Sequence, residues 1–157
     1  MAELQDAEKQ RYVADLFSRI SGRYDLMNDL MTLGMHRRWK KQTAALAVQG
    51  LSGPAIDVSS GTGDLALELA QRPEVDHAVG LDLLPCMVAR AEAKVMGRGM
   101  SNSVSMMTGD ALSLPFADDR FACATAGFSL RNMPDISKAL SEMVRVVRPS
   151  GRVAILE

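Results

Sequence analysis

Residues 56–70 read IDVSSGTGDLALELA, a short β-branched run that leads through a glycine-containing turn into a helical pattern of Leu and Ala. This order of strand, glycine turn and helix is typical of a nucleotide-binding loop in an α/β fold. Gly61, Gly63 and Ala66 also satisfy the G-x-G-x-x-G/A pattern of dinucleotide binders. The stretch therefore predicts a nucleotide site and leaves open which nucleotide binds there.

From residue 55 onward, strand-like runs alternate with segments of helical period. We expect strands at 55–59, 78–82, 104–107, 121–126 and 152–156, and helices at 64–71, 84–97 and 135–147. Strands joined by helical crossovers form a parallel sheet with helices on both faces, so residues 49–157 predict a Rossmann-like α/β domain. The last predicted strand ends at the chain terminus with an unpaired edge. We therefore expect the C-terminal part of this domain to be missing.

Residues 1–48 contain no convincing strand. Apolar residues recur at helical spacing in 13–20 and again in 26–33, and a third helix is expected from near His36 to Gly50. This region predicts an N-terminal helical cap, or a substrate-side arm, on the α/β domain.

Composition limits the class of protein. The chain has 157 residues, 47% of them hydrophobic, and a formal net charge of -1, which argues against broad attraction to nucleic acid. Cys86 and Cys123 lie far apart, without the spacing of metal ligands, so we expect no metal site and a reducing compartment. Residues 1–12 contain acids and no apolar core of a signal peptide. We expect a cytoplasmic protein.

Four predicted strands end in groups that could hold a nucleotide. The first strand leads into Gly61 and Gly63, where the missing side chains let a ligand approach the backbone. Asp82 follows the second strand, about 20 residues beyond the glycines, where a carboxylate can accept from ribose hydroxyls. Asp110 follows the third and can accept from an adenine amino group, and Gly127 follows the fourth. Because these strand ends share one edge of a parallel sheet, we expect one site.

Charge helps to separate the candidate nucleotides. Asp57 and Asp64 flank the turn, where a dinucleotide would bring about two negative charges in its pyrophosphate. S-adenosylmethionine instead brings an ammonium and a sulfonium, together with a carboxylate that the N–H groups of the turn can hold. Asp64 also suits the N-terminus of a helix, so the flanking acids favour S-adenosylmethionine without deciding the matter.

Five stretches of the chain resemble the family of ubiquinone/menaquinone biosynthesis C-methyltransferases. They are SGRYDLMNDLMTLGMHRRWK (21–40), IDVSSGTGDLA (56–66), GDALSLPFADDRF (109–121), FSLRNMPD (128–135) and EMVRVVRPSGRVAILE (142–157). The resemblance implies a class I methyltransferase fold, S-adenosylmethionine as cofactor, and C-methylation of a membrane-borne polyprenylated quinol. The ring is either the naphthoquinol of menaquinone synthesis or the benzoquinol of ubiquinone synthesis. Together with the strand-end analysis, it gives these candidate cofactor residues: Asp57, Gly61, Thr62, Gly63, Asp82, Asp110, Ala111 and Gly127.

The implied chemistry needs a quinol hydroxyl to lose its proton, so that electron density reaches the neighbouring ring carbon. His36 is a candidate general base because the ordinary pKa of histidine is about 6.5, although it also suits the start of a helix. Tyr24 and Arg131 are candidates for contact with the quinol oxygens.

The basic run HRRWKK (36–41) has two interpretations. It is either a solvated helix face or a docking patch for the inner face of the membrane, with Trp39 at headgroup depth. A homo-oligomer formed across the exposed sheet edge is a further expectation.

Two other functions stay open. One is an NAD-dependent oxidoreductase, because fold alone does not decide function. The other is a catalytically incompetent module that binds cofactor without turnover. Methylation of nucleic acid is disfavoured, because residues 127–130 read GFSL and lack the Asn/Asp-Pro-Pro-aromatic loop of enzymes that methylate base amines.

Overall fold

The computed structural model describes Leu30 and residues 32–157. The helices expected before residue 30, and Tyr24 with them, lie outside the described residues. The division of the chain into a cap over 1–48 and a domain over 49–157 therefore stays a prediction.

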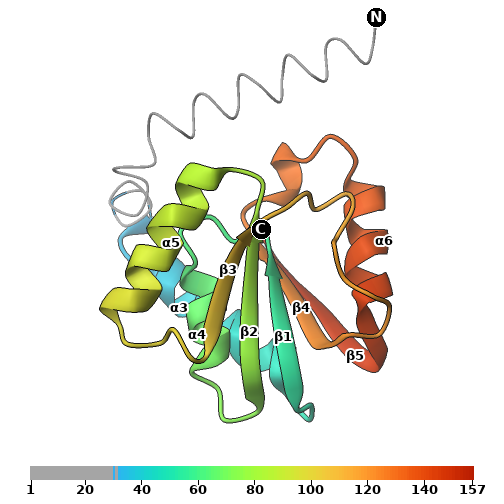
Figure 1. The fold of residues 1–157 in the computed structure, drawn as a ribbon, viewed down its shortest axis with the longest axis horizontal. Helices are drawn as coiled ribbons and strands as arrows, with labels where there is room; N and C mark the ends of the chain where they lie inside the picture. Colours follow the sequence, from blue (N-terminus) through green and yellow to red (C-terminus); the bar gives the residue numbers. More distant parts are fainter. Residues whose placement is uncertain (1–29, 31) are drawn as a thin grey trace, which may run out of the picture.

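The described residues form one five-stranded sheet in the order β3-β2-β1-β4-β5, in which every neighbouring pair is parallel (Figure 1). The strands are β1 Gly53–Val58, β2 Val75–Asp82, β3 Val104–Thr108, β4 Phe121–Gly127 and β5 Val147–Leu156. All five predicted strands are present. The predicted Rossmann-like parallel sheet is confirmed.

The predicted helices are also present. They are α3 Met35–Val48, α4 Asp64–Ala70, α5 Pro85–Gly97 and α6 Ile136–Val146, and a short 3₁₀ helix, η2 Leu130–Asn132, precedes α6. Local chemistry fixes two of the starts, because Pro85 opens α5 and the Asp135 carboxylate accepts the Lys138 N–H at 2.8 Å at the start of α6. Within Leu30 and residues 32–157, every helix is too short or too polar to cross a lipid bilayer.

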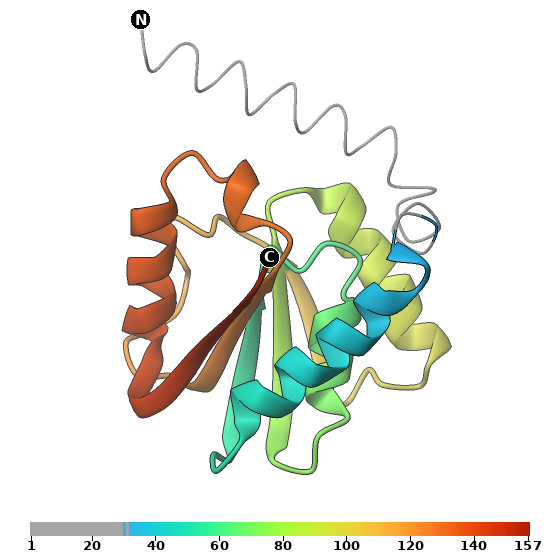
Figure 2. The same ribbon diagram turned by 180° about the vertical axis from the view of Figure 1, so that it is seen from behind.

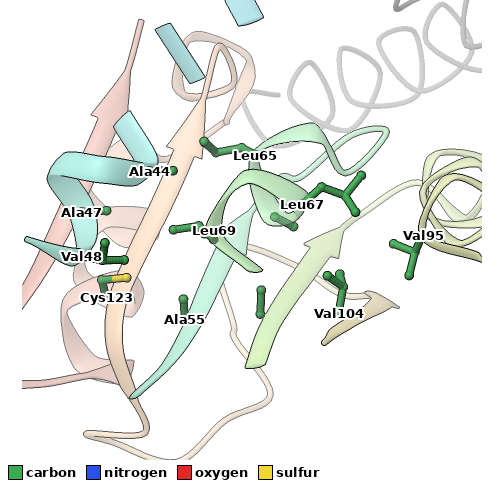
Figure 3. Close-up of a cluster of buried hydrophobic side chains, with 12 residues drawn as sticks. Ala44, Ala47, Val48, Ala55, Leu65, Leu67, Leu69, Val95, Val104 and Cys123 are labelled. Carbon is green, nitrogen blue, oxygen red and sulfur yellow. The ribbon is translucent and has the colours of Figure 1, made fainter. Parts of the chain in front are cut away.

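Helices cover both faces of the sheet, and each face has its own core. Figure 2 shows α3 and α4 lying across one face. Side chains of α3, α4 and α5 pack there with Ala55 and Cys123 from the sheet, as Figure 3 shows. Ile56 and Val58 belong to the second cluster, with Met143 of α6. Neighbouring residues of β1 therefore serve opposite cores, as the alternation of side chains along a strand requires.

Strand β5 is longer than the sequence predicts. It pairs with β4 from Val147, but the register shifts, so that Phe121 faces Val147 while Cys123 faces Arg152. The extra residues form a bulge in which Ser150 has φ 65°. The sequence predicts a strand that begins at residue 152, and the residues before it, Pro-Ser-Gly at 149–151, lie in this bulge inside β5.

Two arginines near the bulge tie the sheet to the end of α3. Arg152 donates to the backbone oxygens of Leu46 and Gln49, the latter at 2.9 Å, and Arg148 donates to the Ser52 oxygen at 2.7 Å. The last carbonyl groups of a helix have no partner within the helix. The Arg152 guanidinium from β5 supplies such partners here, whereas Arg148 binds the segment between α3 and β1.

Candidate functional site

The carboxyl ends of the strands meet at the edge of the sheet marked by C in Figure 1. The glycine turn follows β1, Asp82 ends β2, Asp110 follows β3 and Gly127 ends β4. The structure therefore brings the predicted cofactor residues to one edge, in the order that the sheet dictates.

The glycine turn leaves its backbone open on one side. Gly61 has φ 56° and nothing lies within 4 Å of the position that a Cβ would take. Gly63 has φ 83°, and a Cβ there would lie 3.0 Å from the Cβ of Ala91 in α5. Gly61 therefore gives a ligand access to the backbone, while Gly63 lets the turn pack against α5.

Asp82 is buried and fixed by the turn. One carboxylate oxygen accepts the Gly61 N–H at 2.8 Å, and the other accepts the Leu84 N–H at 2.9 Å. Burial raises the pKa of Asp82 above its ordinary value, and these backbone N–H groups oppose the rise. Since a carboxylate oxygen has more than one lone pair, both oxygens can still accept from ribose hydroxyls.

Asp57 lies beneath the turn and is almost fully buried. Its two oxygens accept from the Ser60 hydroxyl at 2.6 Å and the Thr125 hydroxyl at 2.7 Å. Burial raises the pKa of Asp57 to about 6, although both hydroxyls and the charge of Lys40 lower it. The carboxylate thus holds the turn to β4, a link between residues 68 positions apart that the sequence did not indicate.

Asp64 is paired with two lysines. Lys40 of α3 reaches one oxygen at 2.9 Å, and Lys94 of α5 reaches the other at 2.7 Å. Burial by itself would raise the pKa of Asp64, but the two ammonium groups outweigh it and leave the pKa at about 2. Lys94 also donates to the Thr62 hydroxyl at 3.0 Å. Asp64 therefore adds no uncompensated negative charge to the turn. The expectation that Asp64 would repel the pyrophosphate of a dinucleotide is wrong.

Asp110 and Ala111 lie in a loop that α6 anchors. Asp110 is exposed and accepts the Leu112 N–H at 2.8 Å, whereas Ala111 is buried. Further along the loop, Glu142 accepts the Leu114 N–H at 2.8 Å. The Arg145 guanidinium bonds to Glu142 and also to the backbone oxygens of Leu114 and Phe116 and the carboxylate of Asp118. The loop after β3 is therefore held in shape from α6.

The loop after β4 carries strain. Phe128, next to Gly127, has φ 55°, which is unusual for an aromatic residue. Its N–H donates to the Leu156 oxygen at 2.7 Å, and its ring centroid lies 6.4 Å from that of Trp39. The Ser129 hydroxyl that follows is buried and has no hydrogen-bond partner among the residues that the structure describes.

Two of the candidate catalytic residues can be located. His36 is buried at the start of α3, with Nδ1 2.8 Å from the Thr32 hydroxyl oxygen. The contacts of Trp39 and Lys40 bring this end of α3 to the carboxyl edge of the sheet. Arg131 is 65% exposed in η2, and its guanidinium lies 3.5 Å from the Glu157 carboxylate.

The basic run does not form one exposed patch. Trp39 packs against Phe128, and the Lys40 side chain is only 13% exposed in its pair with Asp64. Arg37, Arg38 and Lys41 are exposed. The docking interpretation thus loses Trp39 as a headgroup anchor and Lys40 as a free cation.

Comparison with known proteins adds to this geometry. The model of the ubiE/COQ5 methyltransferase family matches residues 4–157. The chain is 45% identical to a demethylmenaquinone methyltransferase of Roseiflexus castenholzii, over 96% of this chain and 61% of that protein. It is 40% identical to a ubiquinone/menaquinone biosynthesis C-methyltransferase, UbiE, of Francisella philomiragia, over 96% of this chain and 60% of that protein. The chain therefore spans about 60% of the length of these curated relatives.

A solved structure supports the fold. A SAM-dependent methyltransferase from Aquifex aeolicus superposes with a TM-score of 0.63 and 24% identity, over 71% of this chain and 60% of that one. The strand order, the glycine turn and the match along residues 4–157 agree with one another. The chain belongs to the ubiE/COQ5 methyltransferase family.

Proposed function

We propose that this chain binds S-adenosylmethionine and transfers its methyl group to a ring carbon of a polyprenylated quinol. The product would be menaquinol from demethylmenaquinol, or the corresponding benzoquinol of ubiquinone synthesis. Family membership supports the reaction class. The observation that carries the cofactor is the buried Asp82 carboxylate, which is held by the backbone of an open glycine turn.

The residues present fit this cofactor. Asp82 offers two oriented oxygens to a ribose, and the free space beside Gly61 admits the ligand to the turn. Asp110 is exposed after β3, on the far side of β2 from the turn, where its carboxylate can accept from an adenine amino group. The proposed contacts thus run along the sheet from adenine at β3, through ribose at β2, to the glycine turn after β1.

Charge around the turn also suits a cation. The Asp57 and Asp82 side chains lie at the turn without an ion pair to a described lysine or arginine, while Lys40 and Lys94 pair with Asp64. Bound S-adenosylmethionine would supply an electrophilic methyl group on a sulfonium. The lysines beside the turn favour its carboxylate, and the buried aspartates favour its positive centres.

We assign the acceptor side to the start of α3 and the loop after β4. His36 is the proposed base that removes a quinol hydroxyl proton, and a positioned base contributes about 10²–10⁴-fold to a rate. Tyr24 and Arg131 are proposed to contact the quinol oxygens. The exposure of Arg131 supports a role in meeting the incoming acceptor.

The substrate implies contact with a membrane. The two curated relatives carry names from menaquinone and ubiquinone synthesis, and we infer a prenylated quinol as the acceptor here. We propose a cytoplasmic protein that meets the inner face of the membrane, with Arg37, Arg38 and Lys41 as the exposed cations of the basic run. A homo-oligomer across the β5 edge stays a proposal as well. Neutralising Arg37, Arg38 and Lys41 should lower co-sedimentation with anionic vesicles, and unchanged co-sedimentation would exclude this patch.

Calorimetric titration with S-adenosylmethionine, and with NAD for comparison, tests the cofactor. We expect saturable binding of S-adenosylmethionine that Asp82→Ala weakens about 10- to 100-fold, because hydrogen bonds to a charged group contribute about 1.5–3 kcal/mol. Asp76→Ala removes an exposed carboxylate from the same strand and is the matched control. Binding of NAD in place of S-adenosylmethionine would refute the proposal.

A further inference from the structure

The Ser129 hydroxyl, just past the end of β4, is buried without a partner. Among the side chains that the structure describes, two other buried polar atoms share this condition, in Arg72 and Glu74. Those two residues lie between α4 and β2, where β2 begins, and therefore at the opposite edge of the sheet. Among the described residues, Ser129 is thus the one with an unpaired buried polar side chain at the edge where the strands have their carboxyl ends. Buried polar groups are rarely left unpaired, and exceptions call for a specific explanation.

The loop holds Ser129 in place from both sides. The Ser129 backbone oxygen accepts the Asn132 N–H at 3.0 Å, and the Leu130 N–H donates to the Glu157 carboxylate at 2.8 Å. On the other side, Phe128 is fixed by its bond to Leu156 and keeps φ at 55°. Strained backbone of this kind clusters at ligand sites. The loop therefore does not easily move to give the hydroxyl a partner within the protein.

The sheet order indicates which ligand group would meet Ser129. This step depends on the proposed function. With the ribose at Asp82 and the adenine near Asp110, the nucleoside covers the β2 and β3 side of the turn. The loop after β4 lies on the other side of β1, so it faces the end from which the methyl group leaves. The methyl acceptor must approach at that end.

We propose that the Ser129 hydroxyl is a binding group for the methyl acceptor and hydrogen-bonds to an oxygen on its ring. A hydroxyl can donate and accept, so it suits a phenol and its phenolate alike. Donation to the phenolate would favour the charged form that activates the neighbouring carbon. The Ser129 hydroxyl is buried, so a ring oxygen reaches it only if the atoms that cover it move aside.

The test compares two aromatic probes on the chain saturated with S-adenosylhomocysteine. 1-Naphthol carries one ring hydroxyl, and naphthalene has the same rings without it. We expect Ser129→Ala to weaken 1-naphthol binding about 3- to 10-fold, the range for one neutral hydrogen bond, and to leave naphthalene binding unchanged. Ser141→Ala, at an exposed serine of α6, is the matched control and should change neither.

Two further measurements separate binding from a structural role. Ser129→Ala should not lower the melting temperature of the ligand-free chain, because it removes an unpaired polar group. It should also leave the affinity for S-adenosylmethionine unchanged. Equal effects on both probes, an effect on S-adenosylmethionine alone, or failure of the chain to bind 1-naphthol would each overturn the inference. If S-adenosylmethionine itself does not bind, the proposed function fails first, and the calorimetric titration identifies that case.

Discussion

Replacing Asp57 by Asn should stabilise the protein, and the gain should depend on pH. The Asp57 carboxylate is fully desolvated beneath the glycine turn, where two hydroxyls donate to it. Asn has nearly the same shape and carries no charge. One of the two hydroxyls, of Ser60 or Thr125, can still donate to its Oδ1, and the other can reorient to accept from its Nδ2. The substitution therefore removes the charge while keeping the hydrogen-bonded framework.

The magnitude follows from the shift in pKa. Folding raises the pKa of Asp57 from 3.8 to about 6, which corresponds to about 3 kcal/mol of free energy. Because the folded value is higher, the favourable contribution is fully present below pH 3.8 and is lost as the pH rises through about 6. The Asn variant has no such loss. Its advantage in free energy of unfolding over the natural chain should therefore grow by about 2 kcal/mol between pH 4 and pH 7.

Urea unfolding measures this difference directly. Trp39 is the single tryptophan of the chain and contacts Phe128, so its fluorescence reports loss of tertiary structure. Asp76→Asn, at an exposed carboxylate of β2, serves as the control and should show a small difference that does not vary with pH. If the free energies of unfolding of Asp57→Asn and of the natural chain differ by the same amount from pH 4 to pH 8, the buried Asp57 carboxylate does not oppose folding.

Three other predictions concern the parts that hold the site. Gly63→Ala should lower the free energy of unfolding by about 2 kcal/mol, because Gly63 has a left-handed backbone and a Cβ there would lie 3.0 Å from the Cβ of Ala91. Gly97→Ala, with open space at the end of α5, is the control and should not lower it. Equal effects of the two substitutions in thermal melts would contradict this prediction. Asp64→Asn should destabilise the chain by about 2 kcal/mol at pH 7. Because the pKa of Asp64 is about 2 in the folded chain and 3.8 in the unfolded chain, this destabilisation should shrink as the pH falls from 3.8 toward 2. A destabilisation that persists at pH 2 would show that the lysine pairs are not its cause. Glu142→Gln should weaken S-adenosylmethionine binding about tenfold in calorimetry, because the loop after β3 loses a charged anchor, and unchanged affinity would show that the loop holds its shape without it.

The fold was largely predictable because its signals are local. Strand and helix ranges follow from apolar runs and from helical periods, and the structure confirms these elements. Pro85 and Asp135, at the starts of α5 and α6, are local signals of the same kind. The exception is β5, which starts at Val147 because a bulge absorbs residues that would otherwise break the strand. The register of a bulge depends on the neighbouring strand, so a single chain segment does not reveal it.

The site residues that could be predicted from the sequence are those whose location depends only on where they fall in a strand or turn. Parallel strands bring their carboxyl ends together, so Asp82 and Asp110 could be assigned to one edge with the glycine turn. The charge of the turn could not be predicted, because Lys94 meets Asp64 across 30 residues. The same limit applies to Thr125 beneath Asp57. A motif shows which groups are present near a turn, and distant partners decide which charges remain.

The contact of Arg152 with the end of α3 has a consequence for how the molecule assembles. Arg152 and the Gln49 oxygen that it binds are 103 positions apart, so one of the earliest described helices relies on a partner in β5. Contacts of such long range form late, because a large loop must close before they contribute. During synthesis, α3 therefore lacks its contacts with β5, including the Arg152 cap, until β5 has left the ribosome. Chaperone binding to a nascent chain arrested before residue 147, and its release once β5 has emerged, would be the cellular sign of this order.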